Sequence, residues 1–503
     1  MYIIEYKIKN KFNIYKYLEK CFFKAFLVRN IIIKYIKRQF KKLKKDKDYN
    51  SLLKERNELK KQNKSLKIVN ENLNAIRESY GLSKTSFEKF AKPLARKYKN
   101  YLSSQMIQVI CDDCYKAFER VIFSTGKEIH FKKYDDIMCL KCKDISNGFT
   151  FKSVMDGNVK ISTDYLKVSC PDGQTFTFDI DIKDDYELDA FRPKDIKFIQ
   201  ITRRQFNNYY HYYVQFVTEG VPPLKIQKGK GNSGIDLGVS SVAAACDNKC
   251  FLEDLNPYSK EYEEKIRKKQ NNLNRKLTIN NQDKIENGKF KKGCKLDFSK
   301  NAKKDKKKLK TLQRKKKETD KQYKCKIANE IIQNCDNIYI EPTNFDALKK
   351  RSKKTERSDK PSVIKGKKVY KYKKKKRFGG TVQNKSPSKF LNILEYKCKY
   401  LDIPIIEIDT KSFKASQYNH QTDKCFKKNL NQRWNMLDFD DENKIFVQRD
   451  LYSAFLIKNS DSTLMRADKN KCNKNFKRFV YYHNECIEEV KVNNNNRPSC
   501  FGF

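Results

Sequence analysis

Apolar residues recur at helical spacing through much of the first quarter of the chain. From Ile14 to about Leu43 they share one face, with lysine and arginine on the other, which predicts a long amphipathic helix. The same spacing over residues 101–123 predicts another, with Cys111 and Cys114 on its apolar stripe. Met1 to Ile8 alternates loosely and reads as a strand. We therefore expect one strand followed by a helical region.

A leucine repeat within this helical region admits two interpretations. A basic stretch precedes four leucines spaced seven residues apart, at Leu52, Leu59, Leu66 and Leu73. This arrangement resembles a basic leucine zipper. The companion positions at residues 55 and 62 are polar, however, so only half of the seam is apolar. The pattern favours a helical hairpin packed inside a larger domain.

Period-two alternation dominates from about Gly148 to Val217. Six strands are expected there (FTFKSV, VKIST, LKVSC, TFTFDIDI, IKFIQITRR and YYHYYVQFV), separated by turn residues. This spacing is typical of an antiparallel sheet or barrel. A Pro-Pro pair and the sequence KGKGNSG follow, which places a domain boundary near residue 230. Beyond it, two long charged helices are expected between residues 258 and 334, separated by a polar loop.

Three carboxylates stand at the ends or heads of apolar elements in the second half of the chain. Asp236 ends the strand in GIDLGVS, at residues 234–240, and the chain then turns on Gly238. Glu341 ends the strand in IYIEPTNF, and Asp450 heads the helix VQRDLYSAFLI. A single acid at a strand end is more often a cap or turn residue. Three acids on separate elements favour a site assembled by tertiary folding.

Carboxylates gathered in this way would repel one another unless divalent cations neutralised them. Mg²⁺ prefers hard oxygen ligands of this kind. Two ions about 4 Å apart activate water and stabilise the leaving oxygen in phosphodiester hydrolysis. We therefore predict that Asp236, Glu341 and Asp450 are both metal ligands and catalytic residues, and that they bind two Mg²⁺ ions.

The order GIDLGV, IYIEPTN and QRDLYSAF resembles the split active site of a RuvC nuclease with an RNase H-like fold. More closely, the chain resembles the TnpB proteins of bacterial transposons and the compact type V CRISPR nucleases related to them. GKEIHFKKY at residues 126–134 and ASQYNH at residues 415–420 extend the similarity. The resemblance implies a multidomain α+β protein, in which a β-barrel wedge domain with a helical recognition insert precedes an RNase H-like (RuvC) α/β nuclease domain.

The resemblance also implies a division of the chain. The wedge domain would take its first strand from residues 1–13 and its β-barrel from 126–228, with the helical recognition lobe at 14–125. The nuclease domain would comprise residues 229–414 and 447–490, interrupted by a target-strand-binding insert at 415–446. A disordered tail is expected at residues 491–503, where the sequence is low in complexity.

The formal charge of +50 on 503 residues indicates what kind of partner the chain binds. Self-repulsion on this scale favours a polyanionic partner, and nucleic acid is the obvious one. With the resemblance, this implies guide RNA and target double-stranded DNA. The most apolar stretch, residues 21–36, contains Lys24, Arg29 and Lys34, so it cannot span a bilayer. With no signal peptide visible, we expect a bacterial cytoplasmic protein, associated with the nucleoid through DNA.

Sixteen cysteines without a secretory signal indicate a reducing compartment and no disulfides. Two CxxC pairs, Cys111/Cys114 and Cys139/Cys142, have the arithmetic of a zinc ribbon. The first pair lies in a predicted helix, where cysteine also serves as a small apolar residue. We therefore predict no zinc at these four thiols.

The insert departs from the four-cysteine zinc finger that the resembled family often carries here. His420 and Cys425 offer two ligands, and two ligands do not make a structural zinc site. We therefore expect the insert to pack around Trp434, the only tryptophan. Arg433 is a catalytic candidate, because it corresponds to a basic residue that the family uses near the scissile strand. The alternative is an arginine that stacks on Trp434.

The leading hypothesis is an RNA-guided DNA endonuclease that cuts with a single RuvC site next to a short flanking motif. The first alternative is a transposase or resolvase that acts on DNA without RNA. The second is a guided nucleic-acid-binding repressor without nuclease activity. Retention of all three carboxylates argues against the repressor.

Overall fold

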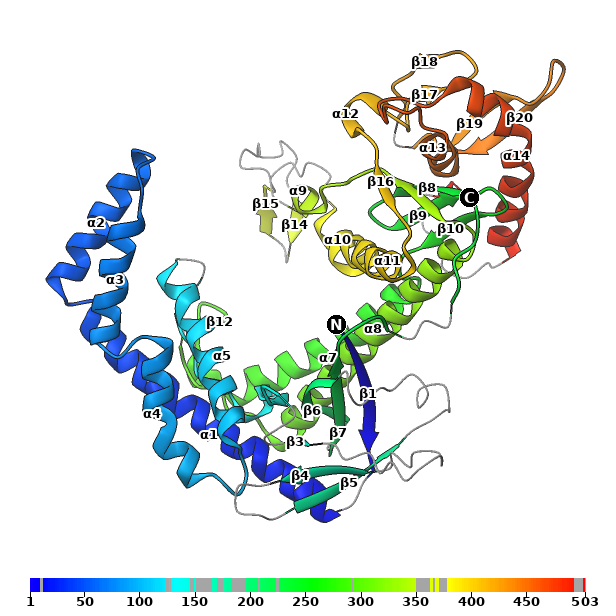
Figure 1. The fold of residues 1–503 in the computed structure, drawn as a ribbon. Helices are drawn as coiled ribbons and strands as arrows, with labels where there is room; N and C mark the ends of the chain where they lie inside the picture. Colours follow the sequence, from blue (N-terminus) through cyan, green and yellow to red (C-terminus); the bar gives the residue numbers. More distant parts are fainter. Residues whose placement is uncertain are drawn as a thin grey trace, which may run out of the picture. The chain divides into compact units, whose positions relative to one another are not determined.

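The computed structural model describes residues 1–9, 12–123, 126, 128–144, 149–150, 165–169, 175–181, 196–206, 209–222, 226–291, 293–349, 362–364, 367–370, 378–429, 431–492 and 501–502. It is a mixed α/β protein (Figure 1). The chain divides into two units, Met1–Pro223 and Leu224–Phe503. The first unit has one hydrophobic core and the second has three clusters of buried apolar residues.

Five α-helices are described in the first unit. They are α1 (Phe12–Leu43), α2 (Lys47–Lys61), α3 (Lys67–Ser79), α4 (Lys84–Lys97) and α5 (Ser104–Ile122). The apolar stripe of α1 is buried along its whole length, from Leu18 and Phe22 to Ile36. Serine side chains at positions 83 and 103 cap the first turns of α4 and α5.

The leucine repeat lies on a helical hairpin. Leu66 occupies the N-cap position of α3, so a turn between α2 and α3 interrupts the repeat. Arg56 of α2 donates from Nε to Oδ1 of Asn70 of α3 at 2.9 Å, which bridges the two helices. The hairpin prediction is confirmed and the leucine-zipper alternative is wrong. A continuous zipper helix would need the unbroken backbone that the turn removes.

The described strands of the first unit form a seven-stranded antiparallel sheet in the order β2-β6-β7-β1-β5-β4-β3. They are β1 (Tyr2–Ile8), β2 (Cys139–Lys141), β3 (Phe149–Thr150), β4 (Tyr165–Ser169), β5 (Thr175–Asp181), β6 (Ile196–Phe206) and β7 (Tyr209–Thr218). β1 pairs with β7 and β5, so the first strand joins strands that come after the helical segment. Closure into a barrel stays a prediction, and the strand expected at VKIST lies outside the described residues.

Arg203 of β6 fixes the segment that leads into β2. Its side chain is 1% exposed, and Nε donates to the carbonyl oxygen of Ile137 at 2.7 Å. The guanidinium also lies over the rings of Phe22, Tyr134 and Tyr210 at 4.2 to 4.6 Å. These contacts offset part of the free-energy cost of burying the charge, while Nη1 of Arg203 has no hydrogen-bond partner among the described residues.

The second unit is built on a five-stranded sheet in the order β10-β9-β8-β13-β16. Its strands are β8 (Asn232–Leu237), β9 (Ser241–Ala245), β10 (Cys250–Asp254), β13 (Asn337–Ile340) and β16 (Ile405–Glu407). β8, β13 and β16 are parallel, whereas β8, β9 and β10 form an antiparallel meander. The carboxyl ends of β8, β13 and β16 therefore meet at one edge of the sheet.

Helices cover both faces of this sheet (Figure 1). On β9, Ala243 and Ala245 face one apolar cluster, while Val242 and Ala244 face the other. Burial on both faces explains why β9 is apolar throughout. The helices described in the second unit are α7 (Ser259–Asn280), α8 (Lys300–Ile332), α9 (Phe345–Lys349), α10 (Gly379–Lys385), α11 (Pro387–Leu401), α12 (Thr410–Phe413), α13 (Arg449–Lys458) and α14 (Lys469–Val492).

A buried polar network ties α8, α10 and α11 together. Lys324 of α8 is fully buried and forms an ion pair with Asp320. Asp320 also accepts from Lys389 of α11 at 2.7 Å, and Lys385 of α10 donates to Asp254 of β10 at 2.7 Å.

The expected pair of long charged helices, α7 and α8, is confirmed. A short hairpin, β11 (Ile285–Glu286) and β12 (Lys289–Phe290), lies in the loop between them.

Three further short hairpins are described in the second unit. They are β14 (Ser362–Ile364) with β15 (Lys367–Val369), β17 (Tyr418–Asn419) with β18 (Lys424–Cys425), and β19 (Trp434–Asp438) with β20 (Lys444–Gln448).

Most of the expected disordered tail lies outside the described residues. Phe501 and Gly502 differ from that expectation, since Phe501 is buried and the carbonyl oxygen of Gly502 accepts the Trp434 indole N–H at 3.1 Å. Apolar burial offsets the entropy of ordering these residues.

None of the helices described is long and apolar enough to span a membrane.

Candidate functional site

Asp236 and Glu341 lie side by side at the carboxyl ends of two neighbouring parallel strands. Ile235 of β8 is in register with Ile340 of β13, and each carboxylate is the next residue along the chain, Asp236 within β8 and Glu341 directly after β13. Parallel neighbours are about 4.8 Å apart in a sheet, so the two backbones place these residues close together. Both side chains are half-buried. The edge of the sheet thus brings together two acids that are far apart in the sequence.

Asp450 comes to the same place on the first turn of α13. Gln448 is the N-cap residue, and its Oε1 accepts from the backbone N–H groups of Asp450 at 2.7 Å and Leu451 at 2.8 Å. The backbone N–H of Gln448 in turn donates to Nε2 of His483 on α14 at 2.9 Å. A carboxylate in the first turn is also favoured by the helix dipole. These contacts fix where the helix begins and where Asp450 lies.

The approach of α13 to β8 depends on Gly234. A Cβ atom at this position would lie 2.1 Å from the carbonyl oxygen of Ala454 and 2.4 Å from the backbone nitrogen of Lys458. Only glycine lets the helix backbone come this close to the strand. Residues two apart on a strand share a face, so Asp236 points to the same side as Gly234. The glycine therefore allows Asp450 to approach Asp236.

The groups around Asp236 act on its pKa in opposite directions. Burial raises the pKa of Asp236 well above its usual value, and the negative charges of Asp450 and Glu341 raise it further. The Arg449 guanidinium and the Ser453 hydroxyl act in the opposite direction. Burial also raises the pKa of Glu341. The predicted carboxylates thus meet within electrostatic range of Asp236.

The three carboxyls are not gathered around one point. Within the described ranges, no group of three or more His, Cys, Asp or Glu side chains is placed to hold a metal ion. Arg449 is instead the nearby cation, with Nε 3.4 Å from Oδ1 of Asp450 and a second nitrogen donating to the carbonyl oxygen of Gln432 at 3.2 Å. The chemistry of the donor set still fits Mg²⁺, because the ligands would be carboxylate oxygens.

Arg449 is the residue that the sequence reasoning missed. Its side chain is 11% exposed and contacts Asp450 directly. The only signal was the Arg-Asp doublet at the head of a helix. In a chain this rich in lysine and arginine, one basic residue cannot be singled out from the sequence. The fold distinguishes Arg449 by showing which acid it contacts.

Arg433 lies next to the start of α13. Its carbonyl oxygen accepts from the backbone N–H of Arg449 at 2.8 Å. Cβ of Arg433 lies against Gly502, where an added Cβ would be 2.6 Å away. The Trp434 ring packs edge-on against His483, with 6.3 Å between ring centroids. The hairpin thus carries Arg433 to the neighbourhood of Asp450, and its catalytic role stays a prediction.

His420 is part of the hydrophobic core. Its Nδ1 atom is 2.6 Å from the Tyr452 hydroxyl, and its ring packs against Phe455 and Phe476. Burial lowers the pKa of His420 to about 4. Cys425, the other ligand candidate in the insert, is exposed on β18. The insert thus joins the core of the second unit through His420 as well as through Trp434.

Two of the four thiols of the possible zinc ribbon donate to separate acceptors. Cys111 donates to the carbonyl oxygen of Phe87 at 3.7 Å, and Cys139 donates to Oε1 of Gln200 at 3.4 Å. Burial raises the pKa of Cys111 and of Cys139 to about 12, and that of Cys114 to about 11. Zinc binds thiolates, so these protonated environments oppose metal binding. The absence of zinc stays a prediction.

Comparisons with known proteins give limited similarity. No protein-family model matches the sequence, and no curated protein matches it. Among solved structures, one similar chain comes from a CRISPR-Cas12f ternary complex, with 12% identity and a TM-score of 0.29 over 92% of this chain and 87% of that one. Another comes from a Cas12i-crRNA-dsDNA complex, with 9% identity and a TM-score of 0.27 over 94% of this chain and 64% of that one. At these scores the likeness carries no conclusion about activity.

Proposed function

We propose that this protein is an RNA-guided DNA endonuclease that hydrolyses phosphodiester bonds at the site of Asp236, Glu341 and Asp450. The proposal rests on three carboxylates, from β8, the end of β13 and α13, of which Glu341 and Asp450 act electrostatically on Asp236. Such a donor set is suited to phosphodiester hydrolysis assisted by divalent metal ions. The alternation of parallel and antiparallel strands around it is compatible with the RNase H-like nuclease that the motifs resemble.

The three carboxylates would hold two Mg²⁺ ions. When bound, such ions supply a Lewis acid for the scissile phosphate and lower the pKa of a bound water. Burial and mutual repulsion raise the pKa of Asp236, so neighbouring positive charge favours its ionised form. Arg449 provides one such charge at the edge of the site. Arg433, close to the start of α13, would contact the phosphate of the scissile strand.

Nucleic acid as the partner follows from charge as well as from the motifs. The formal charge is +50, and α8 places exposed lysines along the helix, at Lys303, Lys304, Lys308, Lys315 and Lys317. The opposite side of α8 is occupied, because Leu309 packs in a cluster with Leu273 and Leu277 of α7. A helix with one packed side and one lysine-rich side is suited to phosphate contacts. Guidance by RNA rests on the resemblance to TnpB and type V nucleases.

The test combines bound RNA with cleavage. Protein expressed from its native locus should carry a defined RNA, and this complex should cut matching duplex DNA only when Mg²⁺ is present. Asp236→Asn, Glu341→Gln and Asp450→Asn should each abolish cleavage and leave RNA binding unchanged. Asp441→Asn is the matched control, since it removes one exposed carboxylate without touching the site. Cleavage by protein without RNA would identify a DNA-only nuclease, and guided binding without any cleavage would identify a repressor.

A further inference from the structure

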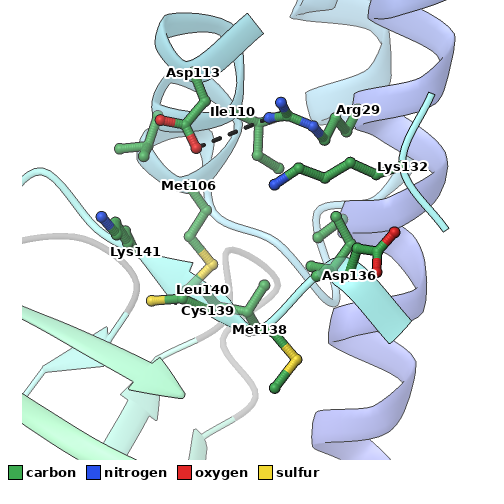
Figure 2. Close-up of a pocket in the computed structure, with 13 residues that line it drawn as sticks. Arg29, Met106, Ile110, Asp113, Lys132, Asp136, Met138, Cys139, Leu140 and Lys141 are labelled. Carbon is green, nitrogen blue, oxygen red and sulfur yellow. Dashed lines mark ion pairs between the residues drawn. The ribbon is translucent and has the colours of Figure 1, made fainter. Parts of the chain in front are cut away.

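A small pocket is lined by residues of the first unit alone. It has a volume of about 180 Å³ and lies between α1, α5 and the segment at residues 132–141 (Figure 2). Met106, Ile110 and Leu140 give it an apolar wall, and Arg29 and Lys132 give it two cations. Ligand pockets for drug-sized molecules usually measure about 300–1,000 Å³. This pocket is therefore suited to a smaller chemical group.

Arg29 has a buried donor with no partner. The side chain of Arg29, on α1, is 11% exposed, and Nε forms no hydrogen bond within the part of the chain that is described. Its one ion pair joins a terminal nitrogen to Oδ2 of Asp113 at 3.9 Å, which is longer than a hydrogen bond. A buried guanidinium donor without an acceptor costs free energy of folding. The site therefore favours a ligand that accepts hydrogen bonds.

Lys132 is held beside Arg29 by its backbone. Asn30 of α1 donates to the carbonyl oxygen of Lys132 at 2.9 Å and accepts from its backbone N–H at 3.1 Å. Figure 2 shows the Arg29 and Lys132 side chains extending together toward α5. Burial lowers the pKa of Lys132, and the charge of Arg29 lowers it further. Two cations are thus placed together although they repel each other.

The carboxylates that line the pocket neutralise this pair only in part. Asp113 and Asp136 raise the pKa of Lys132, against the larger effects of burial and of the Arg29 charge. Asp113 is about half exposed and reaches Arg29 only at 3.9 Å. Asp136 accepts from the backbone N–H of Lys133 at 3.1 Å, and its carboxylate points away from the two cations (Figure 2). Three cationic side chains and two carboxylates line the pocket, Lys141 being the third cation. The excess charge is positive and lies on the side of Arg29 and Lys132.

We propose that this pocket binds a phosphoryl group, held by Arg29 and Lys132. A phosphoryl group is small and anionic, and it accepts hydrogen bonds from both side chains at once. Its charge would relieve the repulsion between the two cations and satisfy Nε of Arg29. The phosphoryl group comes either from the backbone of a bound RNA, which rests on the proposed function, or from a free nucleotide.

The experiment compares Lys132→Met with Lys133→Met. Lys133 is an exposed neighbour whose substitution removes the same charge outside the pocket. Titration of the full chain with inorganic phosphate at fixed ionic strength should show binding about tenfold weaker in the Lys132 variant, as expected for loss of one charge-assisted hydrogen bond. The Lys133 variant should bind phosphate like the wild type. Arg29→Met should show the same loss, and its melting temperature without phosphate reports separately whether it folds.

A second arm identifies the source of the phosphoryl group. If it belongs to RNA, Lys132→Met should reduce the salt dependence of RNA binding by about one charge, and Lys133→Met should reduce it less. Loss of phosphate binding with an unchanged salt dependence would point to a free nucleotide. Equal phosphate binding by the wild type and both lysine variants would overturn the proposal. A protein that carries no RNA would reject the proposed function, and the phosphate titration would still decide the pocket.

Discussion

Replacing Gly234 with alanine should move α13 away from β8 and disable the carboxylate site. The added Cβ would lie 2.1 Å from the carbonyl oxygen of Ala454 and 2.4 Å from the backbone nitrogen of Lys458. Both are backbone atoms, so no change of rotamer relieves the overlap. A Cβ essentially never approaches a neighbouring heavy atom closer than 3.0 Å, so the strand and the helix must separate by at least 0.9 Å, which is 3.0 minus 2.1. Asp450 is carried on the moving helix.

The expected losses follow from this displacement. Overpacking of this kind costs about 1–3 kcal/mol, and each kcal/mol lowers the melting temperature of a domain of this size by roughly 2–4 °C. A misplacement of about 1 Å in a catalytic group can slow a reaction on the order of 10²-fold. Gly234→Ala should therefore melt several degrees lower. The folded, RNA-loaded variant should also cleave duplex DNA about 10²-fold more slowly in single-turnover measurements.

Gly238→Ala is the matched control on the same strand-and-turn segment. An added Cβ at Gly238 meets the carbonyl and hydroxyl oxygens of Ser241 at 3.3 Å, so a shift of a few tenths of an ångström accommodates it. This variant should remain near the wild type in melting temperature and cleavage rate. The reasoning is refuted if Gly234→Ala behaves like Gly238→Ala in both measurements, because α13 would then not depend on the bare backbone at Gly234.

Three further predictions concern residues around and beyond the site. Arg433→Ala should slow single-turnover cleavage by about 2–4 kcal/mol while sparing guide and target binding, whereas a lower melting temperature with unchanged cleavage would show that Arg433 only packs. Burial lowers the pKa of His420 and His483 to about 4 from 6.5, so the unfolded chain binds more protons between these values and stability should fall as pH decreases from 6.5 to 4. Denaturant titrations at several pH values in this range should show that the free energy of unfolding depends less steeply on pH in His483→Gln than in the wild type. An unchanged pH dependence would contradict a buried neutral imidazole. Elemental analysis should find no stoichiometric zinc, and one zinc per chain that is lost in Cys139→Ser would contradict the prediction for the thiols.

Local patterns in the sequence were sufficient for most of the helices and strands. The apolar stripe of α1 and the charged pair α7 and α8 follow the spacing of their residues, because the period of apolar positions reflects the geometry of the element. The polar positions in the leucine repeat already disfavoured a zipper. The structure agrees, because a turn before Leu66 interrupts the helix that a zipper would need. The three carboxylates proposed for the site could also be singled out in this way, since each stands at the end or head of a strongly apolar element.

Tertiary structure decided how these residues meet. The register of Ile235 with Ile340 places Asp236 beside Glu341, and strand register depends on pairings that no local pattern contains. The role of Gly234 became visible only when the backbone of α13 was found against it. Arg449 and the pair formed by Arg29 and Lys132 could not be told apart from the other basic residues of a chain with 111 lysines and arginines. Their contacts and burial distinguish them, because the free energy of a charge depends on what surrounds it.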